Sequence, residues 1–306
     1  MLGLSPPSDA SAFEIEYDHV IKSDREVFKE ATVNFLRTGE NLEVLQWGQM
    51  ENKVIDLPSW VPDLSVDTYP RNPLDDTYAT DGGSDTWVRL TDTKPSKKSP
   101  KPCRPEPSFS EDSEVLILQG LIVDSVHISD RTPDHGFFLR SDATYMERKF
   151  KKLDPLIDTA KKWERILTRY KPDPYTASPG RRHEALWRTL IADRIRHGDQ
   201  VVAAPSYLGR SFDPWMGRNG PSWKEMKSRR TMSTFTYQAQ EYLGAMGRWM
   251  TSRAFLITDR GLVGLGPASM RKGDVVCVLR GGEVPFILRP LEGEYYEFVG
   301  ECYVHG

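Results

Sequence analysis

The amino-acid sequence predicts an α+β protein, in which a helical region packs against a small antiparallel β-sheet or partly closed barrel at the carboxyl end. Two observations support this. Before residue 252, apolar residues recur at helical spacing in several capped segments. After residue 253, short apolar runs alternate with glycine, proline and aspartate, which is typical of strands joined by tight turns. Because no change in composition separates the two patterns, we expect them to share one core.

Residues 1–66 are predicted to contain one helix and a stiff aromatic segment. Ser23 and Glu26 have the spacing of a capping box, apolar residues follow at helical intervals, and Gly39 is the expected end of the helix. Residues 41–47 predict a second, shorter element. The helix is the clearest local prediction in this part of the chain.

Two prolines restrict the backbone on either side of Trp60 in the run Leu57–Asp63. Such a segment presents its aromatic ring at little entropic cost. We interpret Trp60 as a buried anchor that holds the segment against the first helix. The alternative interpretation is that its ring stacks on a ligand.

Residues 67–113 are predicted to form a flexible loop. Proline and lysine alternate there without an apolar period, so the segment cannot bury enough surface to offset its ordering entropy. Its lysines would suit a nucleic-acid patch or an import signal. A solvated loop is the favoured interpretation, because four aspartates lie just upstream.

Residues 114–252 are predicted to be mainly helical. At their start, β-branched and aliphatic residues over 115–128 predict one bent strand or two short strands around Gly120. Three helices are expected to follow, and their limits are Asp154-Pro155 to Tyr170, residues 186–195 with Gly198 as the stop, and Thr234–Met250.

Residues 253–306 are predicted to be a carboxyl-terminal β module. Five short apolar runs indicate five strands, and they cover residues 253–261, 262–267, 274–281, 284–291 and 295–304. Spacing this close suggests a strongly bent sheet. The glycines of Gly261–Gly266 are interpreted as hairpin and barrel-corner residues, because a phosphate-binding turn would have to lead into a helix.

The patterns of chemically active residues predict no cofactor and no metal. His183 and Glu184 begin like a zinc-protease helix, but Trp187 stands where the second histidine must be. Cys302 and His305 are close in sequence, yet residues three apart in a strand face opposite sides. We therefore favour a structural role for both residues over a nucleophilic pair.

The composition narrows the class of protein. With 41 basic and 44 acidic side chains, the net charge is −3, which argues against nucleic-acid binding. The three cysteines, Cys103, Cys277 and Cys302, are too few for a disulfide framework and indicate a reducing compartment. The sequence shows neither a secretory signal nor the ~20 consecutive apolar residues of a membrane span. We expect a cytoplasmic protein.

Two blocks of sequence resemble a known family. The first comprises Met1–Leu4, Ile15–Asp18, the helix after Ser23 and the run Leu57–Asp63, with its Leu-Pro-Ser-Trp-Val-Pro-Asp phrase. The second comprises the carboxyl-terminal phrases between Arg253 and Gly306. Together they resemble the region that follows the HET domain in fungal heterokaryon incompatibility (HET) proteins. The HET domain itself is missing from this sequence, so none of its functional residues can be transferred.

The resemblance implies an accessory or interaction module in fungal self/non-self recognition, without enzymatic activity and with a protein partner. Two alternatives stay open: an enzyme recruited into a secondary-metabolite biosynthetic cluster, which would bind a small molecule, or a truncated gene product. If a ligand site exists, Trp60, Trp249 and His305 are the candidate residues that line it.

Overall fold

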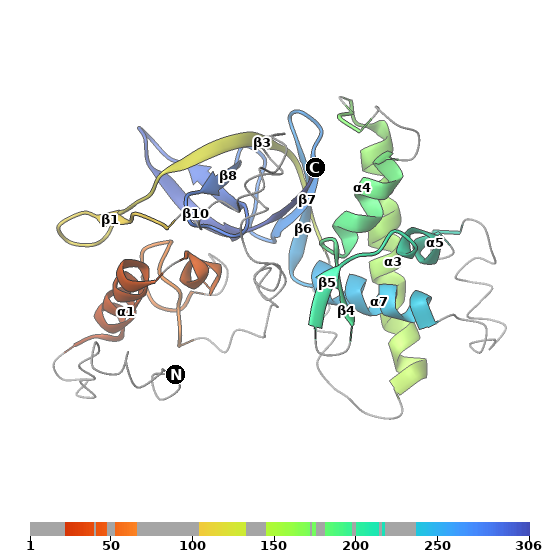
Figure 1. Ribbon diagram of the computed structural model, residues 1–306, viewed down its shortest axis with the longest axis horizontal. Helices are drawn as coiled ribbons and strands as arrows, with labels where there is room; N and C mark the ends of the chain where they lie inside the picture. The colour runs from red at the N-terminus through yellow and green to blue at the C-terminus, as the bar shows by residue number, and fades with distance from the viewer. Residues whose placement is uncertain are drawn as a thin grey trace, which may run out of the picture.

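A seven-stranded antiparallel sheet forms the centre of the molecule in the computed structural model (Figure 1). The structure describes residues 22–39, 41–47, 53–65, 104–132, 145–171, 173–175, 181–197, 200–213, 216–217 and 237–306. Most of the predicted loop 67–113, with Cys103, lies outside these residues, as does the first half of the amino-terminal block that resembles the HET family.

The strand order in the sheet is β10-β9-β8-β3-β6-β7-β11. The strands are β3 (Gly120–Arg131), β6 (Arg253–Thr258), β7 (Val263–Pro267), β8 (Val275–Leu279), β9 (Phe286–Pro290), β10 (Tyr296–Glu301) and β11 (Tyr303–His305). Six of the seven come from the carboxyl-terminal module. The fold class is therefore α+β, as the sequence predicts.

The seventh strand, β3, comes from a distant part of the chain and occupies the middle of the sheet. Its first half pairs with β8 and its second half with β6. Each pairing contains a register shift, between Ile122 and Asp124 on one side and between Val126 and Ile128 on the other. Such bulges bend a strand, so β3 bends near its centre and not at Gly120.

The sheet is curled, but its hydrogen-bonded ladder is not closed. The two edge strands, β10 and β11, are consecutive in the chain and are divided only by Cys302, whose amide donates to the carbonyl of Pro285. The sequence run 295–304 was expected to be one strand. It becomes two because the chain changes partner at Cys302, from β9 to β7.

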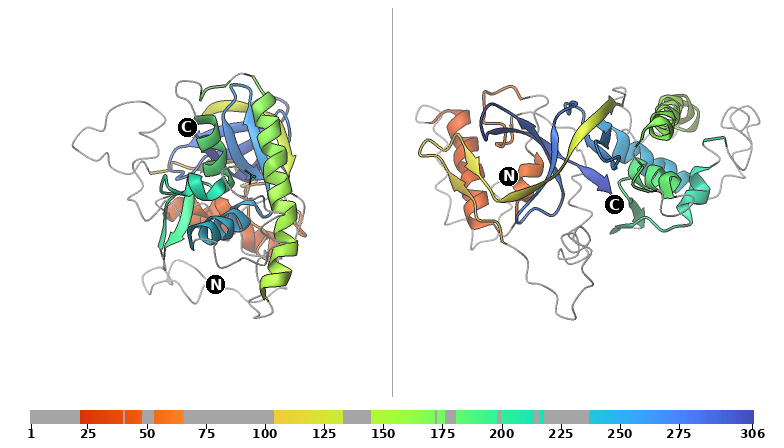
Figure 2. Two further views of the ribbon diagram at one scale, coloured as in Figure 1. Left: turned by 90° about the vertical axis from the view of Figure 1, so that its right-hand side faces the viewer. Right: turned by 90° about the horizontal axis from the view of Figure 1, so that it is seen from above.

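A helical layer covers the side of the sheet formed by β6, β7 and β11 (Figure 2). It contains α3 (Tyr145–Arg169), α4 (Arg181–Leu190), α5 (Leu208–Phe212), α7 (Tyr237–Met250) and the hairpin of β4 (Arg194–His197) and β5 (Gln200–Ala203). In chain order, β3 leads into this layer and α7 leads back into the sheet.

Two helix limits predicted from sequence are wrong. Helix α3 begins at Tyr145 and runs through Pro155, because the residues before the proline are strong helix formers that continue the helix upstream. Helix α4 ends at Leu190, because Ala192 and Asp193 adopt positive φ angles of 46° and 55° and turn the chain into β4.

The amino-terminal segment, residues 22–65, lies at the opposite end of the molecule from the helical layer (Figure 1). Its elements are α1 (Asp24–Thr38) and the 3₁₀ helix η3 (Glu43–Trp47), and they lie near the hairpin of β1 (Ser108–Phe109) and β2 (Leu116–Ile117). The capping box between Ser23 and Glu26 is confirmed, and Gly39 ends the helix as expected.

One hydrophobic cluster connects all three parts. It joins residues of the amino-terminal segment, the helical layer and one face of the sheet, such as Leu36, Trp163 and Phe255. A second, smaller cluster lies on the other face of the sheet and includes Leu256 and Cys302. Both faces of β6 are therefore buried. Among the described residues, no helix has the length and hydropathy to cross a membrane.

Candidate ligand-binding groove

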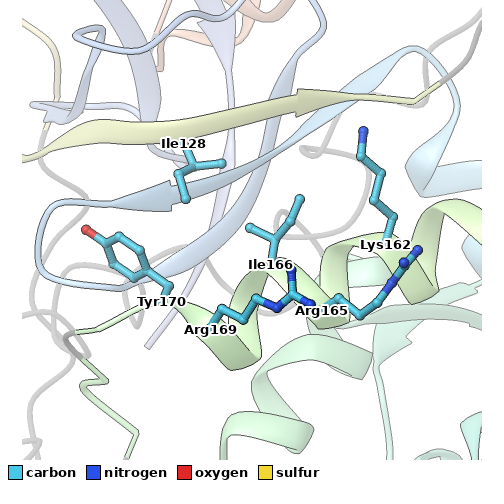
Figure 3. Close-up of a pocket in the computed structure, with 6 residues that line it drawn as sticks. All are labelled: Ile128, Lys162, Arg165, Ile166, Arg169 and Tyr170. Atoms are coloured by element: carbon cyan, nitrogen blue, oxygen red, sulfur yellow. The ribbon is translucent and has the colours of Figure 1, made fainter.

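A groove of about 610 Å³ lies between strand β3 and helix α3 (Figure 3). Its lining consists of Ile128 from the strand together with Lys162, Arg165, Ile166, Arg169 and Tyr170 from the helix and its end. Three of these six residues carry a positive charge, two are aliphatic, and none is acidic. The groove therefore combines an apolar floor with a basic rim.

The buried face of α3 sets the direction of the groove residues. Leu156, Ala160, Trp163 and Leu167 recur at helical spacing and are at most 3% exposed. The Trp163 ring stacks on Phe255 at 5.0 Å. Because this face packs against the sheet, the residues beside it on the helix, among them Lys162 and Ile166, lie next to β3 and line the groove.

An aspartate of β3 fixes the helix against the strand. Asp130 accepts a hydrogen bond of 2.7 Å from the Trp163 indole and pairs with Lys162 at 2.5 Å. The ammonium of Lys162 is therefore already compensated. This arrangement places the groove between two elements that are held by both packing and charge.

The apolar floor consists of Ile128 and Ile166, which are partly buried against the main core and point toward each other (Figure 3). Tyr170 closes one end. Its ring packs against His127 at 5.1 Å, and its hydroxyl donates to the backbone carbonyl of Asp259. Burial raises the pKa of Tyr170, so the hydroxyl is a neutral donor at physiological pH.

Two arginines on the rim have no ion-pair partner among the described residues. Arg165 and Arg169 are exposed, and among the described residues no carboxylate forms an ion pair with either. The Nε of Arg165 donates a hydrogen bond of 3.3 Å to the backbone carbonyl of Lys161. The planar guanidinium groups retain most of their donors for an anion.

None of the three residues expected to line a ligand site belongs to this groove. Trp60 is 6% exposed, its indole donates to the Glu114 carbonyl at 3.1 Å, and its ring contacts Phe109. Trp249 is 2% exposed within α7. Trp60 lies with the amino-terminal segment and Trp249 in the helical layer at the other end, so the fold does not bring these two together (Figure 1).

His305 belongs to a separate cluster near the end of β11. The backbone of this strand pairs with β7 as far as His305, which lies opposite Val263. Its Nδ1 is 2.9 Å from the Tyr303 hydroxyl, and its carbonyl accepts from Tyr175. Desolvation lowers the pKa of His305 and favours the neutral imidazole.

Cys302, for which the sequence favours a structural role, is buried, as is Cys277. Cys302 faces the second cluster, whereas Tyr303, the partner of His305, belongs to the main cluster on the other face. Burial raises the pKa of Cys302 well above its usual value and that of Cys277 to about 12. Both remain protonated thiols, and such thiols are weak nucleophiles.

The two remaining sequence motifs have structural roles. His183 lies on α4 with its Nε2 3.1 Å from an Asp213 oxygen, and the described residues contain no group of side chains that could hold a metal. Gly261 adopts a φ of 88° in the turn between β6 and β7. At Gly264, a Cβ would come within 2.1 Å of the Tyr303 carbonyl, so the close approach of β11 requires glycine.

The groove itself was not predicted from the sequence. Its basic residues have a readable spacing on α3, since Lys162, Arg165 and Arg169 are three and four residues apart. The sequence does not show that Ile128 lies opposite these residues, because no local pattern indicates that β3 lies beside α3.

Comparison with known proteins supports the predicted family. The family described as the Het-6 beta-barrel domain matches residues 213–306, which contain α7 and all strands of the sheet except β3. Heterokaryon incompatibility protein 6, OR allele, of Neurospora crassa is 34% identical over 68 residues, or 21% of this chain. The match spans only 10% of that relative. No solved structure gives a match. The resemblance to the HET family is thus confirmed, and the family match lies in the carboxyl-terminal part of the chain.

Proposed function

We propose that this HET-family chain is a non-enzymatic interaction module that contributes to fungal self/non-self recognition by binding a protein partner in the groove between β3 and α3. The observation that carries the proposal is a pair of exposed arginines, Arg165 and Arg169, which form no ion pair with any carboxylate in the described part of the chain and lie beside an aliphatic floor. Arginine is enriched at protein interfaces, and the core of an interface patch is apolar.

The chemistry of the groove favours binding over catalysis. Tyr170, the lining residue with a hydroxyl, has a raised pKa, and Lys162 is paired with Asp130. A catalytic site needs a nucleophile or a base whose pKa is tuned toward neutrality. The buried thiols and the His305 imidazole lie elsewhere and are engaged in the fold.

Charge reversal at the groove tests this proposal in the fungus. Strains would carry the full chain with Arg165→Glu and Arg169→Glu, or with Lys272→Glu as a control for charge reversal in an exposed turn outside the groove. We expect the double reversal to weaken the incompatibility reaction, measured as cell viability after fusion, and the control to leave it unchanged. An incompatibility reaction equal to wild type in the double reversal would refute the proposal.

The same strains separate the proposal from the recruited-enzyme alternative. Under our proposal, deletion of the gene leaves the profile of secreted and intracellular small molecules unchanged. Loss of a specific metabolite, restored by the wild-type chain, would instead identify an enzyme or a small-molecule carrier.

A further inference from the structure

We infer that the partner enters the groove as an extended acidic peptide, with carboxylates at alternate positions that pair with Arg165 and Arg169 and an adjacent apolar side chain that packs on Ile128 and Ile166. The inference rests on the proposed function and specifies its ligand. It is carried by the charge, the spacing and the apolar floor of the groove.

The charge of the groove selects an anion and restricts its position. Among the described residues, the lining contains three cations and no carboxylate. At one end, Asp130 already compensates Lys162, and near the other end Asp259 pairs with His127 at 2.8 Å. An incoming carboxylate is therefore attracted to Arg165 and Arg169 and gains less beside Asp130 or Asp259.

The spacing of the two arginines matches a peptide better than a single small anion. Residues four apart on a helix are separated by about 6 Å along its axis. In an extended peptide, alternate side chains point the same way and are about 6.6–6.8 Å apart. Two carboxylates at alternate positions can thus meet Arg165 and Arg169 one to one, each through the two parallel hydrogen bonds that a guanidinium offers.

The floor of the groove adds a requirement for an apolar residue. Ile128 and Ile166 face each other between the strand and the helix, and the Tyr170 ring limits the space at one end (Figure 3). Burial of an aliphatic side chain there contributes about 25 cal/mol per Å² of apolar surface removed from water. The recognised pattern is therefore two acidic residues separated by one residue, with an apolar residue two positions further along the same face.

Fluorescence anisotropy with the full-length chain tests the inference. The probe is a labelled peptide of sequence Leu-Glu-Ser-Glu-Ser-Leu, and the matched control peptide is Leu-Gln-Ser-Gln-Ser-Leu. We expect the acidic peptide to bind at least about tenfold more tightly than the amide peptide at low salt, because only carboxylates complement the arginines. Arg165→Glu with Arg169→Glu should abolish that preference, and Lys272→Glu should preserve it.

The remaining variants and outcomes assign the binding to the groove. Ile166→Ser should weaken binding of the acidic peptide several-fold while the preference for acid over amide persists. Equal binding of the two peptides, or unchanged binding by the double reversal, would overturn the inference. Competition by inorganic phosphate at the concentration of the peptide would also overturn it, in favour of a single-anion site.

The peptide and the fungal measurements can fail separately. If the double reversal weakens the incompatibility reaction but no acidic peptide binds, the proposed function stands and this ligand is wrong. If the acidic peptide binds through the arginines but the incompatibility reaction is unchanged, the ligand chemistry stands and the proposed function is wrong.

Discussion

Charged side chains of the amino-terminal segment are held in bonds within the protein, whereas two arginines of α3 in the helical layer face solvent. In the first region, Lys53 donates to the carbonyls of Pro58, Ser59 and Val61 at 2.8–3.0 Å. Arg25 forms two hydrogen bonds to the carboxylate of Glu114. The difference indicates that cationic side chains are engaged by the fold at one end of the sheet, whereas at the other end two of them are available for a ligand.

Removal of the Trp60 side chain is expected to have the largest effect on stability. The indole is buried and hydrogen-bonded to the backbone of Glu114, so Trp60→Ala leaves a cavity and an unpaired carbonyl. We expect a loss on the order of 3–5 kcal/mol of unfolding free energy in urea titrations. Trp60→Phe should cost less, because it retains much of the apolar volume.

Trp47 provides the matched control for this substitution. It lies on η3 in the same segment but is 48% exposed, so Trp47→Ala should cost much less than Trp60→Ala. If Trp60→Ala unfolds like the wild type, the ring has no anchoring role. The amino-terminal segment would then become a second place to look for a ligand.

Lys53 should make stability depend on pH in the alkaline range. Desolvation lowers the pKa of Lys53 from 10.5 to about 8. Between these values, the unfolded chain binds more protons than the folded chain, so the free energy of unfolding rises with pH. After screening by solvent, the gain from this group is on the order of 2 kcal/mol, complete above about pH 10.5 and lost as the pH falls through 8.

A variant without the amine isolates this contribution from other titrating groups. Lys53→Met should be less stable at pH 7, because the carbonyls of the Pro58–Pro62 segment lose their donor. Its unfolding free energy should also lack the rise between pH 8 and 10 in urea titrations. An identical slope in wild type and Lys53→Met would show that the pKa of Lys53 is not lowered.

Loss of the Arg25 guanidinium should have a moderate effect. This group makes a bidentate pair with Glu114 and also donates to the carbonyl of Asp56. The carboxylate raises the pKa of Arg25, which keeps it fully charged. Because the pair is partly exposed, Arg25→Gln should cost about 1 kcal/mol. Thermal melts at low and high salt would measure this loss of stability. A loss near zero would show that Arg25, like the α3 arginines, does not stabilise the fold.

Local features of the fold could be predicted from sequence, and long-range ones could not. The capping box at Ser23 and the glycine turns of the β module follow from the residues involved. Strand β3 was expected as a strand, but its place between β6 and β8 depends on pairing across more than a hundred residues. The end of α4 was missed because Ala192 and Asp193 carry no glycine signal for their positive φ angles.

The candidate site was missed for the same reason. Trp60 and Trp249 were singled out by residue type, but large aromatic residues more often fill cores, and both are buried. The groove depends on the contact between β3 and α3. Without that contact, Lys162, Arg165 and Arg169 would be ordinary cations on a helix surface. With it, they form the rim of an apolar groove.

Neutralising the groove arginines should have the smallest effect on stability. Arg165 and Arg169 are four residues apart on one helix, where like charges repel by about 0.2–0.5 kcal/mol. Arg165→Gln and Arg169→Gln should therefore leave the melting temperature unchanged or raise it slightly at low salt, and added salt should remove the difference. Arg25→Gln, measured alongside, loses the same charge but also loses its bonds to Glu114. A loss above about 1 kcal/mol in either groove variant would show that these arginines hold the fold together. The groove would then have no charge free for a partner.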